Sequence, residues 1–341
     1  MPADHASQRA ARFSAKYWAF RVAAAVIPVM PLWISDPLAR LAGLAVYAAA
    51  PGMRRKARAN LARIPGLERP AMLERACRGA FQHLALNYVD FFRTRTVDAR
   101  RVAAEYSVEH EELFHQALAR GKGLIVVSAH LGNWEIALSR MSMFGIPVTI
   151  PAERVKPERL FELTRTLRAR RCVRMVPVDR RESLREMLAA LARNEIVLLA
   201  IDRDVTGTGV PVPLFGALAP IPTGGVLLAR RSGATVLWAS SWRVGRGHSV
   251  GAFAAIEPPV AEPDGATEAR DDGQAALRRA LRPQVKMIER KVAEHPEQWV
   301  AVFADIWPDH AGTGETASPD MRSGAPAGRM QAHDVALADR S

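Results

Sequence analysis

The sequence predicts an α/β fold with a mostly parallel central sheet flanked by helices and an apolar helical segment at its N-terminus. Two observations lead to this prediction. Residues 123–128 and 196–201 are short apolar runs, which are typical of strands buried on both faces of a sheet. Amphipathic segments with helical spacing lie between such runs, and this alternation predicts parallel strands joined by helical crossovers.

The first 60 residues are expected to form helices that lie in a membrane interface. Residues 17–52 are rich in apolar side chains, but charged residues interrupt them before they reach the roughly 20 residues that span a bilayer. Trp18 and Trp33 suit the depth of lipid headgroups, and a basic cluster follows at residues 54–58. The alternative is an ordinary helical hairpin buried against the rest of the protein.

Residues 61–310 are expected to form one α/β domain. Apolar residues recur at helical spacing in two segments before the first strand, and Gly121 ends the second of them. The patterns predict, in chain order, helices at 70–92 and 111–120, a strand at 123–128, a helix at 133–144, a strand at 147–150, helices at 157–171 and 183–193, a strand at 196–201, a helix at 224–231, strands at 234–240 and 249–256, and a helix at 275–294.

Two segments lack such patterns. Residues 257–273 are rich in Pro, Asp, Glu and Gly, which is typical of a surface loop. Residues 311–341 carry small and charged residues without periodicity, so we expect a disordered tail there.

The composition narrows the range of functions. The chain has 341 residues, 47 Lys and Arg against 35 Asp and Glu, and a net charge of +12, which suggests an anionic partner such as a phospholipid surface, a nucleic acid or an acidic carrier. Its two cysteines, Cys77 and Cys172, lie too far apart in the sequence for a zinc ribbon or a disulfide scaffold, so no metal is expected. The aromatic fraction is 6% and no stripe alternates basic with aromatic residues, so no nucleic-acid partner is expected.

One motif carries the chemistry. The segment Ser128-Ala-His130-Leu-Gly-Asn-Trp-Glu135 follows a predicted buried strand and opens a predicted helix, so His130 is expected at the edge of the sheet. Asn133 is suited to cap the helix, and a Glu135 carboxylate that turns back toward the imidazole would fix its tautomer. A histidine held in this way can take a proton from a hydroxyl as a general base. The alternative is a structural histidine.

Several blocks of the sequence resemble, in the same order, bacterial lipid A late acyltransferases and phosphatidylinositol mannoside acyltransferases of the lysophospholipid acyltransferase superfamily. The resemblance covers roughly residues 15–308. It rests on the His-x4-Asp/Glu motif His130-Leu-Gly-Asn-Trp-Glu135 and on four further blocks, which are Arg58-Ala-Asn-Leu-Ala-Arg63, Pro151-Ala-Glu-Arg-Val-Lys-Pro-Glu158, Asp202-Arg-Asp204 with Val212-Pro-Leu-Phe-Gly216 and Pro222-Thr-Gly224, and His295-Pro-Glu-Gln-Trp299.

The resemblance implies a glycerolipid acyltransferase-like fold and an O-acyltransferase reaction. His130 would deprotonate an acceptor hydroxyl, which attacks the thioester of acyl-CoA or an acyl carrier protein, with no other cofactor. The acceptor would be a glycolipid of the phosphatidylinositol mannoside or lipid A type, at the cytoplasmic face of the inner (plasma) membrane. The glutamate at position 135 favours glycolipid over glycerol phosphate acceptors. Alternatives are an acyltransferase for a lysophospholipid and a noncatalytic membrane-peripheral lipid-binding protein.

The resemblance also suggests roles for other residues. It places an acidic residue beside His130, and both Glu135 and Asp202 stay open as that partner. A basic residue that meets donor phosphate or the developing oxyanion is expected at Arg168, with two neighbouring arginines, Arg165 and Arg170, as rivals. Further substrate-binding residues are expected at Asn133, Arg154, Lys156, Arg203 and Asp204, with a basic surface loop or a solvated turn as the alternative.

The apolar stretch that follows the motif has two interpretations. Residues 136–150, with Trp134, Met141, Met143 and Phe144 in or beside them, are expected either to line a pocket for an acyl chain or to form plain core.

Overall fold

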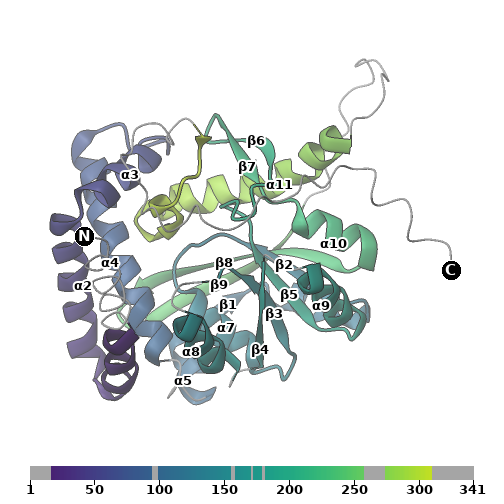
Figure 1. Ribbon diagram of the computed structural model, residues 1–341, viewed down its shortest axis with the longest axis horizontal. Coiled ribbons are helices and arrows are strands. Elements are labelled where there is room, and N and C mark those ends of the chain that lie inside the picture. Colours follow the sequence, from purple (N-terminus) through teal and green to yellow (C-terminus); the bar gives the residue numbers. More distant parts are fainter. Residues whose placement is uncertain are drawn as a thin grey trace, which may run out of the picture.

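A seven-stranded sheet forms the centre of the computed structural model, which describes residues 17–93, 99–154, 158–169, 172–178, 181–256 and 273–308 (Figure 1). The strand order is β1-β9-β8-β2-β5-β3-β4. All neighbours are parallel except β8 and β9, which are antiparallel. The predicted α/β fold with a mostly parallel sheet is therefore confirmed. The strands are β1 (Tyr106–Glu109), β2 (Leu124–Ser128), β3 (Val148–Ala152), β4 (Val173–Pro177), β5 (Ile196–Ala200), β8 (Thr235–Gly245) and β9 (His248–Ala255).

Two features of strand pairing shape the carboxyl edge of the sheet. β2 and β5 pair along five residues, from Leu124 opposite Ile196 to Ser128 opposite Ala200. β3 and β5 pair only at their first two positions, after which the strands separate. The sheet is thus continuous at its centre and open between β3 and β5 at the edge where the parallel strands end.

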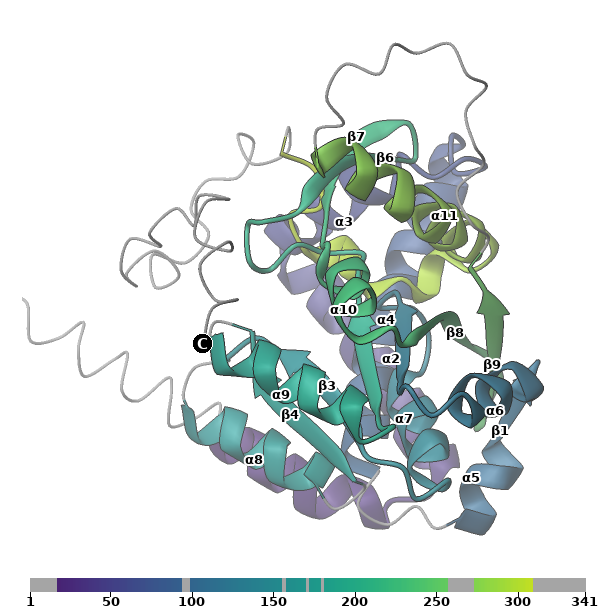
Figure 2. The same ribbon diagram turned by 90° about the vertical axis from the view of Figure 1, so that its right-hand side faces the viewer.

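Helices cover both faces of the sheet. Side chains of α9, α10 and α11 share one core with β2 and β5 residues such as Val127 and Leu199. Side chains of α6, α7 and α8 share the second core with residues of the opposite parity, such as Val126 and Leu198. Figure 2 shows α9 and α8 on opposite sides of β3 and β4. The helices are α6 (Glu111–Ala119), α7 (Trp134–Ser142), α8 (Glu158–Ala169), α9 (Arg181–Ala192), α10 (Gly224–Ser232) and α11 (Gly273–Glu294), which is followed by the 3-10 turns η2 (Pro296–Gln298) and η3 (Val300–Phe303).

The N-terminal segment is helical, and it packs along a long helix of the domain. Residues 17–26 are helical, and η1 (Ile27–Val29), α2 (Leu32–Ala49) and α3 (Pro51–Leu61) follow before α4 (Pro70–Arg93). Pro31 lies at the start of α2, where a missing N–H costs nothing. Across the described residues, no helix is both long and apolar enough to cross a membrane.

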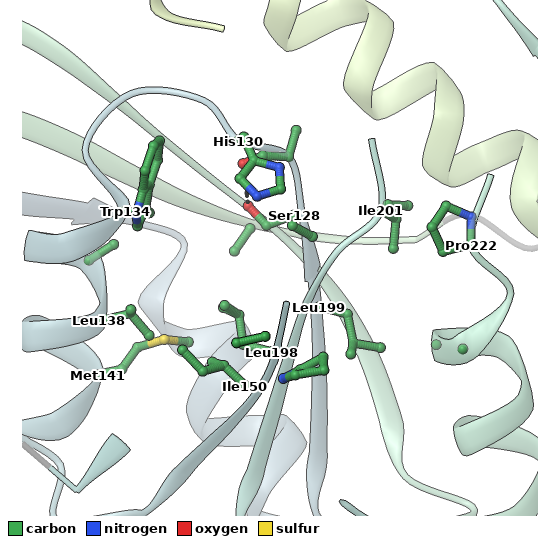
Figure 3. Close-up of a pocket in the computed structure, with 18 of the residues that line it drawn as sticks. Ser128, His130, Trp134, Leu138, Met141, Ile150, Leu198, Leu199, Ile201 and Pro222 are labelled. Carbon is green, nitrogen blue, oxygen red and sulfur yellow. Dashed lines mark hydrogen bonds between the residues drawn. The ribbon is translucent and has the colours of Figure 1, made fainter. Parts of the chain in front are cut away.

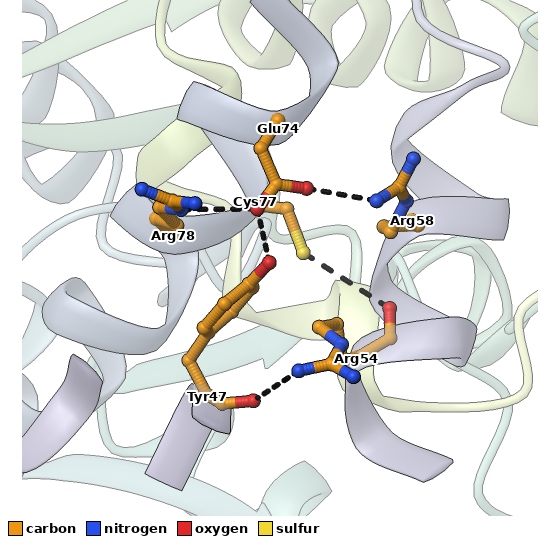
Figure 4. Close-up of polar contacts among 6 residues, drawn as sticks. All are labelled: Tyr47, Arg54, Arg58, Glu74, Cys77 and Arg78. Atoms are coloured by element: carbon orange, nitrogen blue, oxygen red, sulfur yellow. Dashed lines mark hydrogen bonds and ion pairs between the residues drawn. The ribbon is translucent and has the colours of Figure 1, made fainter. Parts of the chain in front are cut away.

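A polar cluster joins α2, α3 and α4 (Figure 4). The Glu74 carboxylate on α4 accepts hydrogen bonds from the Tyr47 hydroxyl and from Arg58 Nη1 at 2.8 Å and Arg78 Nε at 3.0 Å. The hydrogen bond from Tyr47 and the nearby arginines lower the pKa of Glu74 below its usual value. Arg54 Nη1 donates to the Tyr47 carbonyl at 3.1 Å, so the three helices are tied together at this point.

Several elements have no counterpart in the predictions. These are α5 (Ala99–Glu105), β1, β4 and an antiparallel pair formed by β6 (Val210–Leu214) and β7 (Ala217–Ile221). β6 contains Pro211 and Pro213, which argue against a strand inside a sheet. The pair tolerates them because it stands apart as a two-stranded sheet, in which the outward N–H of each strand needs no partner strand.

His83 on α4 is a buried histidine at the contact of α4 with η2. Burial, followed by the positive charges of Arg243 and Arg40, lowers its pKa from 6.5 to about 3. Between these two values the unfolded chain binds a proton that the folded protein does not bind. Stability therefore rises with pH across this window and is lost as the pH falls through it.

We expect His83→Gln to reduce the acid sensitivity of the fold. From pH 7 to pH 5 the variant should lose about 2 kcal/mol less free energy of unfolding than the wild type, because this proton uptake is removed. Urea denaturation at each pH measures the difference. His115→Gln is the control, since that side chain is 57% exposed and hydrated in both states. Equal losses in the wild type and His83→Gln would contradict the prediction.

Candidate active site

His130 and Asp202 meet because β2 and β5 are parallel neighbours in register. Ser128 lies opposite Ala200 at the strand ends, and His130 and Asp202 each follow two residues later. Nδ1 of His130 is 2.8 Å from Oδ1 of Asp202, and the backbone N–H of His130 donates to Oδ2 at 2.8 Å. The pair therefore lies beyond the carboxyl ends of the strands, where open parallel sheets bind ligands.

The Asp202 carboxylate is fully buried and accepts a third hydrogen bond, from Nε1 of Trp299 at 2.8 Å. Burial alone would raise its pKa. The interaction with the His130 charge and the hydrogen bonds from His130 and Trp299 outweigh burial and lower the pKa of Asp202 below its ordinary value. An ionised carboxylate only accepts, so the neutral imidazole carries its proton on Nδ1 and leaves Nε2 as the basic nitrogen.

An apolar cavity of about 810 Å³ lies against His130 (Figure 3). The His130 side chain is 38% exposed and lines the cavity together with Trp134. Leu138 and Met141 of α7 line its deeper part. Further lining comes from residues at the opening between β3 and β5, namely Ile150, Pro151, Ala152, Leu198, Leu199 and Ala200. The separation of these two strands thus gives the cavity its place beside the imidazole.

The apolar stretch after the motif takes part in this cavity, with exceptions. Phe144 lines the cavity as Met141 does. Met143, just after the end of α7, is 39% exposed, and Ile136 is buried in a separate cluster with Val102 and Tyr106. The helical period explains the difference, because only one face of α7 points at the cavity.

The Glu135 carboxylate faces Arg168 rather than the imidazole. It is buried in the first turn of α7 and forms an ion pair with the Arg168 guanidinium, which comes from the last turn of α8. The indole N–H of Trp134 also donates to it at 3.2 Å. Of the two acidic residues that the sequence leaves open, Asp202 is the one in contact with His130. Glu135 does not turn back toward the ring, because Arg168 and the indole of Trp134 engage its carboxylate.

The loop between His130 and α7 is held close to β8. Gly132 has φ +62°, and a Cβ at this position would lie 2.1 Å from the carbonyl oxygen of Ser241, so no other residue fits. Asn133 caps α7 as the sequence predicts, and its Oδ1 accepts a hydrogen bond from the N–H of Ile136 at 3.3 Å. The Asn133 side chain is buried and engaged in this cap.

Of the other residues expected to bind substrate, Arg203 and Asp204 line the cavity and Arg154 is not among its lining residues. Arg203 lines the cavity and pairs with Glu153 at 2.5 Å, which links the loops after β5 and β3. The Asp204 carboxylate accepts the N–H groups of residues 206, 207 and 209 and so organises its own loop. Arg154 lies 3.5 Å from Glu158. Lys156 falls outside the described residues.

The structure describes one of the two rivals of Arg168. Arg165 forms an exposed pair with Glu162 at 2.7 Å on the surface of α8, and Arg170 falls outside the described residues. Arg168 itself lines the cavity, and its guanidinium lies 5.4 Å from the ring of Phe91. Within the described ranges, no group of three His, Cys, Asp or Glu side chains is placed to hold a metal ion.

Trp299 is the site residue that sequence reasoning did not single out. Its block at residues 295–299 marks it as part of a motif, but nothing in the local pattern ties an indole to a carboxylate almost 100 positions earlier. A tryptophan followed by an apolar run is most often simple core. The contact depends on the path of the chain after α11.

Comparisons with known proteins give a consistent picture. Residues 5–304 match the family of bacterial lipid A biosynthesis acyltransferases. The chain is similar to the phosphatidylinositol mannoside acyltransferase of Mycobacterium tuberculosis, with 28% identity over 257 residues that cover 74% of this chain and 77% of that protein. It is similar to the enzyme of the same name from Mycolicibacterium smegmatis, with 26% identity over 261 residues that cover 76% of this chain and 84% of that protein.

We expect Arg168→Ala to destabilise the fold by about 3–5 kcal/mol, because it leaves the buried Glu135 carboxylate without its cation. Adding Glu135→Gln should recover much of this loss by removing the buried charge. Arg165→Ala is the matched control, one turn earlier on α8, and its exposed pair should contribute about 1 kcal/mol or less. Chemical denaturation measures all three. If Arg168→Ala were no worse than Arg165→Ala, the pair would not stabilise the fold as argued.

Proposed function

The chain belongs to the family of bacterial lipid A biosynthesis acyltransferases, and from this premise we propose that it moves a fatty acyl chain from an acyl thioester to a hydroxyl group of a glycolipid. His130 is the general base in this proposal. The observation that carries it is the 2.8 Å contact between His130 Nδ1 and the buried Asp202 carboxylate at the mouth of an apolar cavity. The donor is acyl-CoA or an acyl carrier protein, and no other cofactor is required.

The proposed step needs only the imidazole and its carboxylate. Nε2 of His130 takes the proton of the acceptor hydroxyl as its oxygen attacks the thioester carbonyl carbon. The C–S bond then breaks, and the departing thiolate takes the proton back from the imidazolium. Asp202 stabilises the imidazolium between these events, as a buried carboxylate does in a catalytic triad. No acyl group is attached to the protein at any stage.

The cavity is suited to the acyl chain of the donor. Its deep lining is apolar and buried, with Leu138, Met141 and Ile150 each less than 10% exposed. Its volume of about 810 Å³ lies within the range of ligand pockets, which is roughly 300–1,000 Å³. A chain that enters it past His130 would leave its thioester carbonyl beside the imidazole.

A glycolipid is the acceptor class that both comparisons favour. The matched family is described by lipid A and the similar mycobacterial proteins by phosphatidylinositol mannosides, and both are lipids with sugar headgroups. The His130–Asp202 pair and its cavity also give a reason to prefer an enzyme over a noncatalytic lipid-binding protein. A lysophospholipid acceptor is the alternative, and mass spectrometry of the acylated product distinguishes it from a glycolipid acceptor.

The N-terminal helices offer a surface for the membrane that such substrates require. Trp18, Val22 and Val26 follow at intervals of four along one helix and are 58%, 59% and 45% exposed. Trp33 and Leu41 form a similar exposed stripe on α2. Exposed apolar stripes next to basic residues are typical of helices that lie in a lipid interface. We propose that this surface docks on the cytoplasmic face of the inner (plasma) membrane.

His130→Ala should lower acyl transfer by about 10²- to 10⁴-fold with the fold intact, because general-base catalysis is lost. The measurement uses palmitoyl-CoA with total lipids of the source cell and mass spectrometry of the acylated product. Ser139→Ala, which removes a buried hydroxyl of α7 near the site, should retain transfer. A folded His130→Ala protein with wild-type turnover would refute the assignment of the base.

The double variant Trp18→Ser/Trp33→Ser should bind anionic phospholipid vesicles more weakly, by about tenfold for each tryptophan lost. Cosedimentation with vesicles measures the binding. Leu218→Ser is the control, since Leu218 is 61% exposed on the β6–β7 pair, away from the N-terminal helices in Figure 1. Equal vesicle binding by the double variant and the wild type would exclude this surface.

A further inference from the structure

The indole of Trp299 contacts the oxygen of Asp202 that does not face the imidazole ring. Nε1 of Trp299 donates to Oδ2 at 2.8 Å, while Oδ1 lies 2.8 Å from Nδ1 of His130. Trp299 is 0% exposed and Asp202 is 1% exposed, so water does not compete for this hydrogen bond. A carboxylate held at both oxygens cannot rotate about its Cβ–Cγ bond.

The backbone around Trp299 holds the other partner of the pair. The N–H of Val300 donates to the carbonyl of His130 at 3.0 Å, and the N–H of Gly132 donates to the carbonyl of Gln298 at 3.1 Å. Leu131 and Trp299 therefore form an antiparallel bridge. Residues 298–300 thus contact the loop that carries His130 through their backbone and Asp202 through a side chain.

We propose that Trp299 is a positioning residue, which fixes the Asp202 carboxylate so that it orients the His130 imidazole, and that residues 298–300 act as one clamp on both partners. This inference rests on the proposed function and adds a third member to its machinery. Trp299 does not touch the reacting atoms, and it is not itself one of the residues that line the cavity. Its indole acts through Asp202.

The clamp is itself rigidly held. The Gln298 side chain accepts the backbone N–H of Arg243 at 2.8 Å and donates to the Arg243 carbonyl at 3.0 Å, which joins the clamp to β8. The Trp299 ring packs against Phe215 and Trp307 at centroid distances of 6.1 and 6.4 Å. At Glu297, the residue just before the clamp, Gly79 of α4 lies so close that a Cβ on Gly79 would approach the Glu297 side chain to 2.6 Å. Because these contacts hold the clamp, the indole of Trp299 can hold Asp202 in one position.

Simple packing is the competing explanation, and it makes a different prediction. If Trp299 only fills space, any ring of similar size without an N–H should preserve the site. If it positions Asp202, loss of the indole N–H leaves Oδ2 with only the backbone N–H of His130 as a donor among the described residues, and the buried carboxylate is held less firmly. The imidazole then loses its fixed tautomer, and kcat falls while the KM for the acyl donor stays nearly unchanged.

The test compares Trp299→Phe with Trp238→Phe. Trp238 on β8 is equally buried and belongs to the same core, and its indole nitrogen makes no hydrogen bond within the described part of the chain. We expect Trp299→Phe to lower kcat by about 10- to 100-fold, as for loss of a hydrogen bond to a charged group, and Trp238→Phe to keep the wild-type kcat.

A second measurement reads the tautomer without any turnover. In protein labelled with ¹⁵N-histidine, at a pH where the imidazole is neutral, wild-type His130 should show a protonated Nδ1 and a bare Nε2. Its signals are assigned by their absence in His130→Ala. Trp299→Phe should show a mixture of tautomers, whereas Trp238→Phe should match the wild type.

A tryptophan analogue shows whether the effect of Trp299→Phe comes from loss of the N–H or from a folding defect. Replacing Trp299 with β-(benzothien-3-yl)alanine keeps the bicyclic shape but has sulfur in place of the N–H, and it should reproduce both the loss of kcat and the mixed tautomer. A folded analogue protein with wild-type kcat and a single tautomer would overturn the proposal. Absence of transfer in the wild type would instead count against the proposed function, and the tautomer comparison would still decide the role of Trp299.

Discussion

The in-register parallel pairing of β2 with β5 is the constraint on which the site depends. It puts two loops from distant parts of the chain at the same height above the sheet, so a histidine and an aspartate at equal offsets must meet. Burial of the aspartate then makes the contact strong, because few water molecules can compete for it. A shift of one residue in this register would turn one of the two side chains to the opposite face and separate the pair.

The same sheet also makes room for a substrate. β5 is paired with β2 along its whole length but with β3 at only two residues. The sheet edge is therefore closed between β2 and β5 and open between β5 and β3. The cavity occupies this opening. The acid–base pair and the apolar space are therefore two results of one strand arrangement, in which β5 returns between β2 and β3.

The sequence predicts local features of this arrangement better than its long-range pairings. β2, β5 and the cap of α7 follow from apolar runs and from Asn133, because burial on both faces requires an uninterrupted apolar strand. The choice between Glu135 and Asp202 depends on which strands are neighbours, which no local pattern contains. The contact of Trp299 with Asp202 likewise depends on how the chain returns after α11.

The contact of residues 298–300 with the loop at His130 affects when the site can form during synthesis of the protein. Strands β2 and β5 leave the ribosome long before this segment does, since the chain emerges from its N-terminus. Until residue 300 has emerged, Asp202 lacks its indole donor and the loop lacks its backbone partners. A nascent chain can therefore form most of the sheet before residues 298–300 hold His130 and Asp202 in place. The complete site forms only when synthesis of the domain is nearly finished.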